Sequence, residues 1–387
     1  MNRIKIGDAC EILNGFAFKS DNYTTSGIRI IRIANVQKGY IEDNTPAFYP
    51  LDSSGLDKYM LEEGDLLMSL TGNVGRVALL GKEFLPAALN QRVACLRLKT
   101  EKITKGYLFH ILNSDFFENQ CIQSSKGVAQ KNMSTEWLKE YDLPLYPADE
   151  QKKITTLLDL VHGIIAARQH ELQSLDDLIK ARFVEMFGEP ETNPKGWERV
   201  TLNDVCSSIV RGPFGSTLKK EFFVEPNETT YKVYEQKNAI QKSATIGTYY
   251  VPAEKYNELK RFECKAGDIL MSCSGTMGEV YQLPDGCEKG IINQALCKFT
   301  LNERILPIYF LVYMQQTIGN LETKGSGIQN IAAVSYVKAM PINLPPIEIQ
   351  KQFAAFIAQI DKLKSVVEKA LIKAQLMLNT MVHQFFD

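Results

Sequence analysis

The sequence predicts an α+β fold in which two pseudo-symmetric α/β domains are joined by two long helices that form an antiparallel coiled coil. Three observations support it: a duplication that covers the chain, strand-like and helical patterns repeated within each copy, and a heptad pattern that closes each copy. The length of 387 residues suits two or three domains of roughly 100 to 200 residues each. The expected order is a domain over 1–147, a helix over 148–188, a domain over 194–345 and a helix over 346–387.

A glycine-rich motif that occurs twice reveals the duplication. Residues 63–77, EGDLLMSLTGNVGRV, align with 266–280, AGDILMSCSGTMGEV, and eight of the fifteen positions are identical. Asn90-Gln91 matches Asn293-Gln294 at the same offset. Farther on, LPLYPADEQKKI aligns with INLPPIEIQKQF. The chain is therefore a tandem repeat of two similar units.

Strand-like runs come first in each copy. They are rich in β-branched and apolar residues that partly alternate, as strands do. The expected strands cover 29–36, 65–70 and 75–80, with counterparts at 232–239, 268–274 and 278–283. TGNVG (71–75) and SGTMG (274–278) lie between two strands, and we expect hairpin turns in which glycine supplies a positive φ.

Helical patterns follow the strands. Apolar residues at spacings of three and four predict helices over 107–120 and 309–321. Each copy then ends in a longer heptad pattern, preceded by proline, which predicts a helix of about 60 Å if it runs for about 40 residues. The predicted helix-pairing seam consists of Ile154, Leu158, Val161, Ile165, Leu172, Leu175, Ile179 and Met186 in the first helix and Phe353, Ile357, Ile360, Val367, Leu371, Leu378, Met381 and Phe385 in the second. Arg168, Arg182 and Lys364 interrupt the seam and leave the local packing open.

The repeat suggests how the seams are covered. Two copies related by a pseudo-two-fold axis would place their long helices antiparallel, so that each closes the other's apolar seam. Such an arrangement would hold two similar readers in opposite orientation, as a bipartite DNA site demands. A helical hairpin used for dimerisation is the alternative explanation of the helices alone.

Composition excludes several classes of protein. Lys plus Arg is 44 and Asp plus Glu is 45, so any basic surface must be local. No apolar stretch approaches the roughly 20 residues of a membrane-spanning helix, and Asp8 and Glu11 interrupt any signal-peptide pattern. The eight cysteines form no CxxC pair, and we expect reduced, mostly buried thiols.

The sequence offers no constellation for catalysis or metal binding. The four histidines, His110, His162, His170 and His383, lack the spacing of a helical zinc site, and solvated helix positions explain them best. We therefore predict no catalytic residue, no metal ligand and no cofactor bound by this chain.

Polar and basic stretches that recur in both copies are the candidates for DNA contact. Arg can read guanine and Asn or Gln adenine through paired hydrogen bonds, while Lys on a loop mainly contacts phosphate. In the first copy the candidates are Lys19, Ser20, Arg29, Arg32, Asn73, Arg76, Gln91, Arg92, Lys126, Gln130, Lys131 and Asn132. In the second copy they are Arg211, Ser216, Lys219, Lys220, Thr276, Gln294, Lys324, Gln329 and Asn330.

The whole pattern resembles the specificity (S) subunit of type I DNA restriction-modification systems. The resemblance is carried by the two glycine-rich motifs, by GFAFKS (15–20) and GPFGSTLKK (212–220), and by LPLYPADEQKKITTLLD and LPPIEIQKQFAAFIAQID at the starts of the long helices. It implies that residues 1–147 and 194–345 are target-recognition domains, each reading one half of a split double-stranded DNA target. The helices over 148–188 and 346–387 would set the spacer length.

The resemblance also implies partners, and a cytoplasmic location in a prokaryote. Two methyltransferase (M) subunits would dock on the helices and use S-adenosylmethionine to methylate adenine. Restriction (R) subunits, which use ATP and magnesium, would complete the nuclease, and no membrane is involved. Two alternatives stay open: the specificity subunit of a fused methyltransferase-endonuclease of type IIB-like organisation, and a coiled-coil scaffold with no DNA role.

Overall fold

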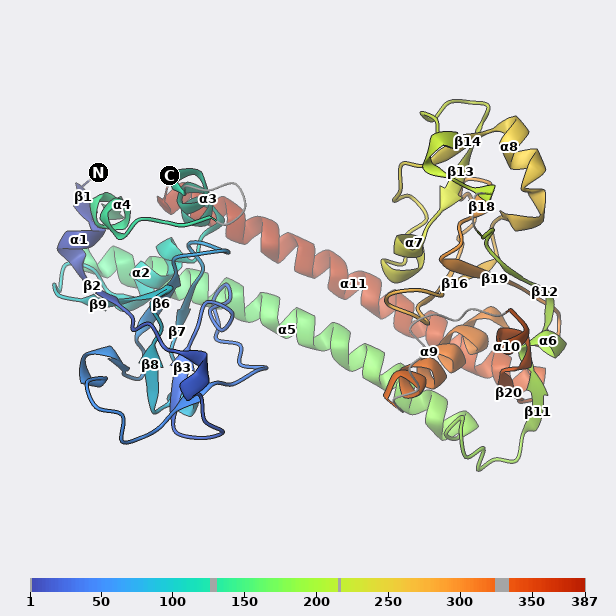
Figure 1. Cartoon of the computed structure of the whole chain (residues 1–387), viewed down its shortest axis with the longest axis horizontal. Coiled ribbons are helices and arrows are strands. Elements are labelled where there is room, and N and C mark those ends of the chain that lie inside the picture. The colour runs from blue at the N-terminus through green and yellow to red at the C-terminus, as the bar shows by residue number, and fades with distance from the viewer. Residues whose placement is uncertain (1, 126–130, 215–216, 324–333, 387) are drawn as a thin grey trace. The chain divides into compact units, whose positions relative to one another are not determined.

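The computed structural model describes residues 2–125, 131–214, 217–323 and 334–386 (Figure 1). The chain forms two compact units: the first is Met1–His170 with Glu368–Asp387, and the second is Glu171–Val367. The division falls within both long helices, whereas the predicted domain boundaries follow the ends of those helices. Each unit thus contains part of each helix.

Its described residues give the first unit two four-stranded sheets and a two-stranded sheet. In sheet order, the first four-stranded sheet consists of β2 (Cys10–Asn14), β9 (Val93–Leu98), β6 (Leu66–Ser69) and β7 (Val77–Leu79). The second consists of β4 (Phe48–Tyr49), β3 (Ile28–Ile31), β8 (Ala87–Leu89) and β5 (Met60–Leu61), and β1 (Asn2–Lys5) pairs with β10 (Asp142–Leu145). The α-helices before the long one are α1 (Ile6–Ala9), α2 (Lys105–Leu112), α3 (Asp115–Ser124) and α4 (Thr135–Glu140).

The second unit repeats this topology strand for strand. Its sheets are, in order, β12 (Cys206–Arg211), β19 (Leu296–Leu301), β16 (Ile269–Ser272) and β17 (Val280–Gln282); then β14 (Tyr250–Pro252), β13 (Thr230–Tyr234), β18 (Gly290–Ile292) and β15 (Glu263–Cys264); and β11 (Glu198–Thr201) with β20 (Pro341–Leu344). Its α-helices are α6 (Leu202–Val205), α7 (Gln236–Ile240), α8 (Ala253–Glu258), α9 (Pro307–Thr323) and α10 (Val334–Ala339).

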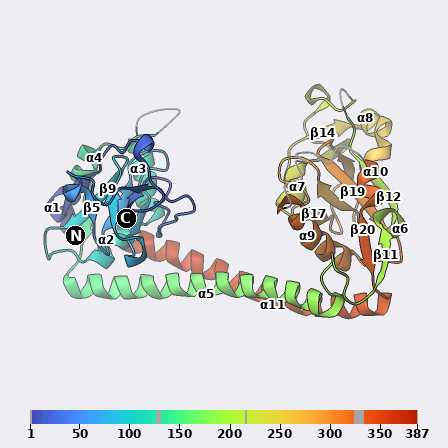
Figure 2. The same ribbon diagram turned by 60° about the horizontal axis from the view of Figure 1, so that its bottom comes forward.

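The two units also share strand direction and register. The pairs β3–β8 and β13–β18 are parallel, while the pairs β6–β7 and β16–β17 are antiparallel hairpins. Within the second unit, α9, β11 and β20 lie next to that unit's long-helix segments, and the sheet that contains β13 and β14 lies farther away (Figures 1 and 2). The duplication seen in the sequence is therefore a duplication of fold.

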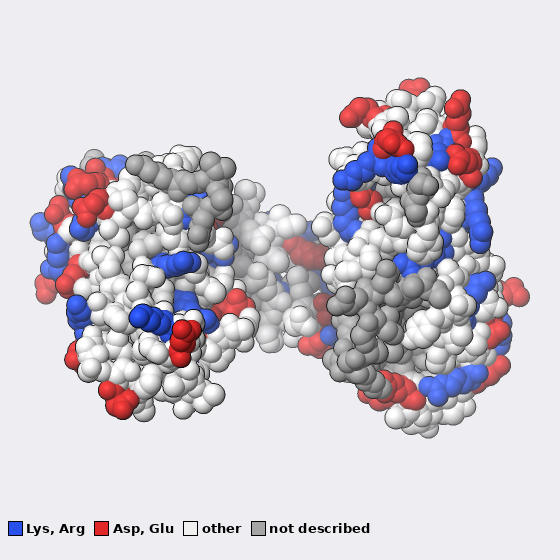
Figure 3. All heavy atoms as spheres, in the orientation of Figure 1, with Lys and Arg blue, Asp and Glu red and all other residues white. Residues whose placement is uncertain are grey.

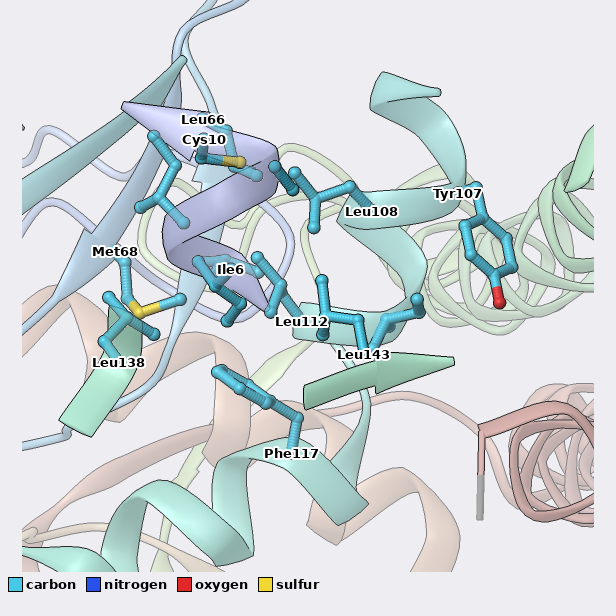
Figure 4. Packing of buried hydrophobic residues seen from close by; sticks show 14 of the residues in the cluster. Ile6, Cys10, Leu66, Met68, Tyr107, Leu108, Leu112, Phe117, Leu138 and Leu143 are labelled. Atoms are coloured by element: carbon cyan, nitrogen blue, oxygen red, sulfur yellow. The ribbon is translucent and has the colours of Figure 1, made fainter. Parts of the chain in front are cut away.

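A core of apolar side chains joins the sheet to the helices in the first unit. Figure 4 shows side chains from α1, β2, β6, α2, α3, α4 and β10 pointing into one cluster. The labelled members are Ile6, Cys10, Leu66, Met68, Tyr107, Leu108, Leu112, Phe117, Leu138 and Leu143. Ile154, Leu158 and Val161 of the long helix belong to the same cluster, so this helix is part of the core.

The long helices are α5 (Ala148–Phe187) and α11 (Ile347–Phe386). In the first unit, Ile154, Leu158 and Val161 of α5 share a core cluster with Met381 and Phe386 of α11. The second unit joins the opposite ends of the helices, since Phe183 and Phe187 cluster there with Phe353 and Ile357. The helices are therefore antiparallel, as the fold prediction required.

The predicted seam positions differ in burial along the helices. Those that are buried are Ile154, Leu158, Val161, Phe353, Ile357, Ile360, Val367 and Met381. Those that are partly buried are Ile165, Leu172, Leu175, Ile179, Met186, Leu371, Leu378 and Phe385. Lys364 pairs with Asp176 in the second unit, so an ion pair accommodates this charged seam position.

Phe183 and Phe187 were not predicted as seam residues, although they are 0% and 2% exposed. The strict heptad pattern selected Arg182 and Met186 instead. At this end of α5 the helix packs on α9 as well as on α11, with Phe183 and Tyr309 stacked at 5.5 Å between ring centroids. Because α5 contacts a second helix here, its buried face is shifted by one residue from the predicted seam, from Arg182 and Met186 to Phe183 and Phe187.

Three predictions about shorter elements are wrong. The strand expected over 29–36 ends at Ile31, and the Asn35 side chain then accepts the Arg32 N–H at 2.9 Å in a turn. The helix expected over 107–120 is two helices, because Ser114 is extended (φ −75°, ψ 149°) and its hydroxyl caps α3 by accepting the Phe117 N–H at 3.1 Å. The strand expected over 232–239 ends at Tyr234, and the short helix α7 follows. In all three places a local hydrogen bond from the backbone to a side chain overrides the apolar spacing.

The cysteines agree with the prediction of reduced thiols. All eight are free, seven are buried and Cys287 is half-buried. Burial raises the pKa of the Cys10 thiol and of the Cys206 thiol to about 12, which keeps both protonated at neutral pH. Among the described residues, no helix has the length and apolar character needed to cross a membrane.

Candidate nucleic-acid interface

A buried serine shapes the glycine-rich turn of the first unit. The Ser69 hydroxyl accepts the Arg76 N–H at 3.1 Å and donates to the Asn73 carbonyl. Gly72 and Gly75 have φ values of 72° and 81°, which L side chains rarely adopt. As predicted, the turn is a β-hairpin with glycine in left-handed positions, and it leaves Asn73 exposed.

The second unit builds the same turn. The Ser272 hydroxyl accepts the Glu279 N–H at 3.0 Å and donates to the Thr276 carbonyl at 2.6 Å. Gly275 and Gly278 have φ values of 60° and 84°. The scaffold is thus constant, while Asn73 and Arg76 in the first unit are replaced by Thr276 and Glu279 in the second.

Three other segments lie beside the turn in the first unit. Leu70 accepts the Met133 N–H at 2.9 Å and donates its own N–H to the Arg92 carbonyl at 3.0 Å. The Gln91 N–H in turn donates to the Phe16 carbonyl at 2.9 Å. These backbone bonds join loops that are far apart in sequence. We call this region the polar edge of the first unit and define it as residues 16–22, 70–76, 89–92 and 131–133.

Most described DNA-binding candidates of the first unit are exposed on this polar edge. Loops held on a rigid scaffold are common sites of recognition, and exposed donors and acceptors suit contacts with bases or phosphates. The exposed candidates are Lys19, Ser20, Asn73, Gln91, Arg92, Lys131 and Asn132. Lys126 and Gln130 lie outside the described residues.

Arg29 and Arg32 have partners within their own unit. Arg29 forms an ion pair with Asp43, and its guanidinium lies 4.9 Å from the centroid of the Phe48 ring. Arg32 donates a hydrogen bond to the Thr45 carbonyl. Both side chains are half-buried and secure the loop after β3, a role that the sequence did not suggest.

Arg76 is likewise engaged inside the first unit. It donates a hydrogen bond to the Gln37 side chain at 2.7 Å and lies 3.6 Å from a Glu118 carboxylate oxygen. Its position next to the turn had made it a candidate for DNA contact. To contact DNA, the Arg76 side chain would have to leave both Gln37 and Glu118.

The second unit has a corresponding polar edge. The Gly212 N–H donates to the Leu296 carbonyl at 3.0 Å, and the Cys273 N–H donates to the Ala295 carbonyl at 2.7 Å. We define the polar edge of the second unit as residues 212–214, 217–222, 273–279 and 293–296. Its exposed candidates are Lys219, Lys220, Thr276 and Gln294.

Arg211 differs from the other candidates of the second unit. It is only 5% exposed, its guanidinium lies 4.9 Å from the centroid of the Phe214 ring, and it donates to the Gln294 carbonyl at 3.4 Å. This places Arg211 beneath the edge, where it supports Gln294. Ser216, Lys324, Gln329 and Asn330 lie outside the described residues.

On the visible face, the charged side chains of the described residues do not form one continuous basic field. Figure 3 shows Lys and Arg in small separate groups with Asp and Glu among them. This distribution agrees with the near balance of charges in the sequence. Any attraction to phosphate on this face must therefore come from a few local cations.

One pair of structurally important positions was not predicted from the sequence. Gln151 and Gln350 are fully buried and occupy the same place in the first turn of the two long helices. Gln151 accepts the Thr104 N–H at 2.9 Å, and Gln350 accepts the Leu306 N–H at 2.8 Å. The sequence did contain a sign of this role, because glutamine occurs at the same position in the aligned segments that begin the two long helices.

His110 also departs from the sequence expectation. It is 4% exposed, its Nε2 lies 2.7 Å from an Asp159 carboxylate oxygen, and its ring stacks on His162. Burial lowers the pKa of both imidazoles. A cavity of about 850 Å³ in the first unit is lined by these groups and by His383. The described residues contain no cluster of three or more His, Cys, Asp or Glu suited to a metal ion.

Comparison with known sequences places this architecture in a family. The chain is 25% identical over 415 residues to a putative type I restriction enzyme MjaX specificity subunit from Methanocaldococcus jannaschii, a match that covers 97% of this chain and 92% of that protein. It is 32% identical over 190 residues to the type I restriction enzyme EcoAI specificity subunit of Escherichia coli, covering 46% of this chain and 32% of the relative. This second match therefore spans about a third of the relative's length.

Solved structures share the fold. A chain from a study of complex assembly and conformational transition in a type I restriction-modification system superimposes with a TM-score of 0.60 at 17% identity, covering 99% of this chain and 96% of that one. The S subunit from M. genitalium gives a TM-score of 0.52 at 14% identity, covering 100% and 96%. The family model for the type I restriction modification DNA specificity domain matches twice, over residues 1–176 and 194–376. With one match to each copy of the repeat, the chain belongs to the family of type I restriction-modification DNA specificity subunits.

Proposed function

We propose that this chain is the sequence-reading subunit of a type I restriction-modification complex and that each unit reads one half of a bipartite DNA target. The observation that carries the proposal is the polar edge, which occurs in both units on the same scaffold with side chains that differ at several positions, such as Asn73 and Thr276. Equivalent scaffolds would dock on DNA in the same way, and different side chains would read different bases.

The long helices supply the remaining parts of this function. Their length would fix the spacer between the two half-sites. Their exposed apolar residues would bind two M subunits, since apolar side chains that solvent reaches mark protein-binding surfaces when they gather in rows. Leu157, Leu160 and Ile164 form such a row on α5, and Leu363 and Val366 belong to another on α11.

The chemistry would then belong to the partners. The M subunits would hold S-adenosylmethionine and methylate adenine, and the R subunits would use ATP and magnesium to cut DNA. This chain would have no catalytic step of its own and would act in the cytoplasm of a prokaryotic cell. Its contribution to each reaction is the choice of the DNA site.

Co-expression with the methyltransferase encoded beside it tests the proposal. Long-read sequencing of the host DNA should reveal a split motif with one methylated adenine on each strand. A complex that assembles but produces no such motif, and that has no salt-dependent affinity for random duplex DNA, would identify a scaffold with no DNA role instead.

A further inference from the structure

Polar residues that are identical in the two units mostly have structural partners. Asn35 accepts the Arg32 N–H at 2.9 Å, and Asn238 accepts the Glu235 N–H at 2.8 Å. The paired serines of the turns and the paired glutamines of the long helices likewise bind backbone groups of nearby loops within their own unit, as described above. Their identity is explained by the fold that both units share.

The Asn-Gln pair after β8 and β18 separates into two roles. The Asn90 side chain accepts the Arg92 N–H at 3.2 Å, and the Asn293 side chain accepts the Ala295 N–H at 3.0 Å. These asparagines therefore hold the loop in a fixed turn. The next residue in each loop, Gln91 or Gln294, is presented by that turn to the surface.

Gln91 and Gln294 depart from this pattern. Both are exposed on the polar edges, and the structure gives neither side chain a hydrogen-bond partner among the described residues. The fold therefore does not account for the shared glutamine. A ligand feature that is the same at both edges would account for it.

We propose that Gln91 and Gln294 contact the same kind of base pair, an A·T pair, at the same position of the two half-sites. The inference rests on the proposed function, in which each half-site contains an adenine to be methylated. Different half-sites then share two features, the phosphate backbone and this A·T pair. A glutamine amide pairs with the N6 and N7 edge of adenine or donates to O4 of thymine.

Lys19 and Lys219 account for the other shared feature. Each is exposed on its polar edge and immediately precedes a short 3-10 helix, Ser20–Asn22 or Lys220–Phe222. A charged ammonium on a long stem suits phosphate, which is the same in every sequence, better than a neutral amide does. The shared lysines would thus position each unit on the phosphate backbone, and the shared glutamines would read the A·T pair.

Residues that differ between the edges would read the differing bases. Asn73 occupies the position of Thr276, and Arg92 occupies that of Ala295. All four lie on the polar edges beside the shared glutamines. An Asn73→Ala variant is therefore the matched control, because it alters an exposed residue that only the first unit has.

The test uses the full chain co-expressed with its methyltransferase. The variants are Gln91→Ala, Gln294→Ala, the isosteric Gln91→Glu, Lys19→Ala and the Asn73→Ala control. Methylation is mapped in vivo, and binding of the purified complex is measured against duplexes that carry each base at each target position. Binding is repeated at several salt concentrations.

Gln91→Ala should relax discrimination at one position of the first half-site by about 10- to 100-fold, and Gln294→Ala should do so at the equivalent position of the second. Both positions should be A·T in the wild-type motif. Lys19→Ala should weaken all sequences alike and reduce the salt slope by about 1. Asn73→Ala should leave discrimination at the shared A·T position intact.

Three results would overturn the inference. The first is that both glutamine variants methylate the wild-type motif unchanged. The second is that they bind all sequences equally more weakly, with a lower salt slope. The third is that they lose discrimination at positions that are not A·T in both half-sites. The second result would identify a phosphate contact only. If wild-type protein gives no split motif, the proposed function fails instead, so the two failures are distinguishable.

Discussion

At the scale of single residues, buried glutamines attach each long helix to its own unit. Gln151 accepts the Thr104 N–H at 2.9 Å and donates to the Lys102 and Tyr146 carbonyls at 2.7 and 2.9 Å. Gln350 makes the corresponding bonds with Leu306, Arg304 and Pro345 in the second unit. One side chain thus fixes two loops to the first turn of a helix.

Replacing Gln151 with methionine should therefore destabilise the first unit. Methionine keeps the volume but leaves backbone groups without their partner, so the free energy of unfolding should fall by about 1–3 kcal/mol. Urea unfolding of the full chain measures the change. Gln169→Met, an exposed position on the same helix, is the control and should change stability by less than about 0.5 kcal/mol. Equal effects at the two positions would contradict this role.

His110 should make the first unit sensitive to acid. Burial lowers the pKa of its imidazole, although the hydrogen bond and charge of Asp159 oppose that effect. The native state thus resists the proton that the unfolded chain takes up near the ordinary histidine pKa of 6.5, so stability should fall as pH drops below that value.

Urea midpoints at several pH values between 7 and 5 measure this dependence. The Tyr107 and Tyr309 hydroxyls donate to the Pro144 and Asn343 carbonyls, which aligns α2 with α9 and makes His110 the counterpart of Val312. His110→Val, which introduces the residue of the second unit, should therefore flatten the dependence. Asn379→Ala, an exposed change in the same unit, is the control and should retain the wild-type slope. A steeper slope in His110→Val would contradict the assignment.

At the scale of elements, the sequence predicted structures that repeat and missed those set by local contacts. The β6–β7 and β16–β17 hairpins were predictable because glycine, serine and apolar positions recur in both copies. The break at Ser114 was not, because apolar spacing continues through it while a hydroxyl cap ends the helix. The second sheet contains strands as short as Phe48–Tyr49, too short for a recognisable alternation.

The candidate interface shows the same limit. Exposed polar residues such as Gln91 were predictable from their recurrence in a loop. The internal partners of Arg29 and Arg76 depend on contacts with residues elsewhere in the sequence, so composition and spacing could not reveal them. Gln151 was visible as a repeated residue, but only its burial shows what it does.

The helices should act as a spacer ruler, which a heptad deletion tests. Lys364 pairs with Asp176, so removing residues 172–178 together with the facing residues 362–368 keeps the two seams in register. Each helix loses about 10 Å, which corresponds to about three base pairs. The mapped motif should keep both half-sites and shorten its spacer by that amount. Altered half-sites with an unchanged spacer would refute the ruler.

At the scale of the whole molecule, two equivalent scaffolds present different side chains. Each unit has its own sheets, its own core and its own polar edge, and the family model matches each copy separately. The numbers of acidic and basic residues are nearly equal, so the chain as a whole exerts little general attraction on DNA. Specificity would then come from a few exposed residues. The central claim is that each unit reads its half-site independently.

Exchanging residues 1–147 for the corresponding domain of another family member tests this claim most directly. The chimera and the wild-type chain are each co-expressed with the methyltransferase, and methylated adenines are mapped by long-read sequencing. We predict that one half-site changes to the donor's sequence while the other half-site and the spacer stay the same. A motif in which both half-sites change would contradict independent reading by the two units.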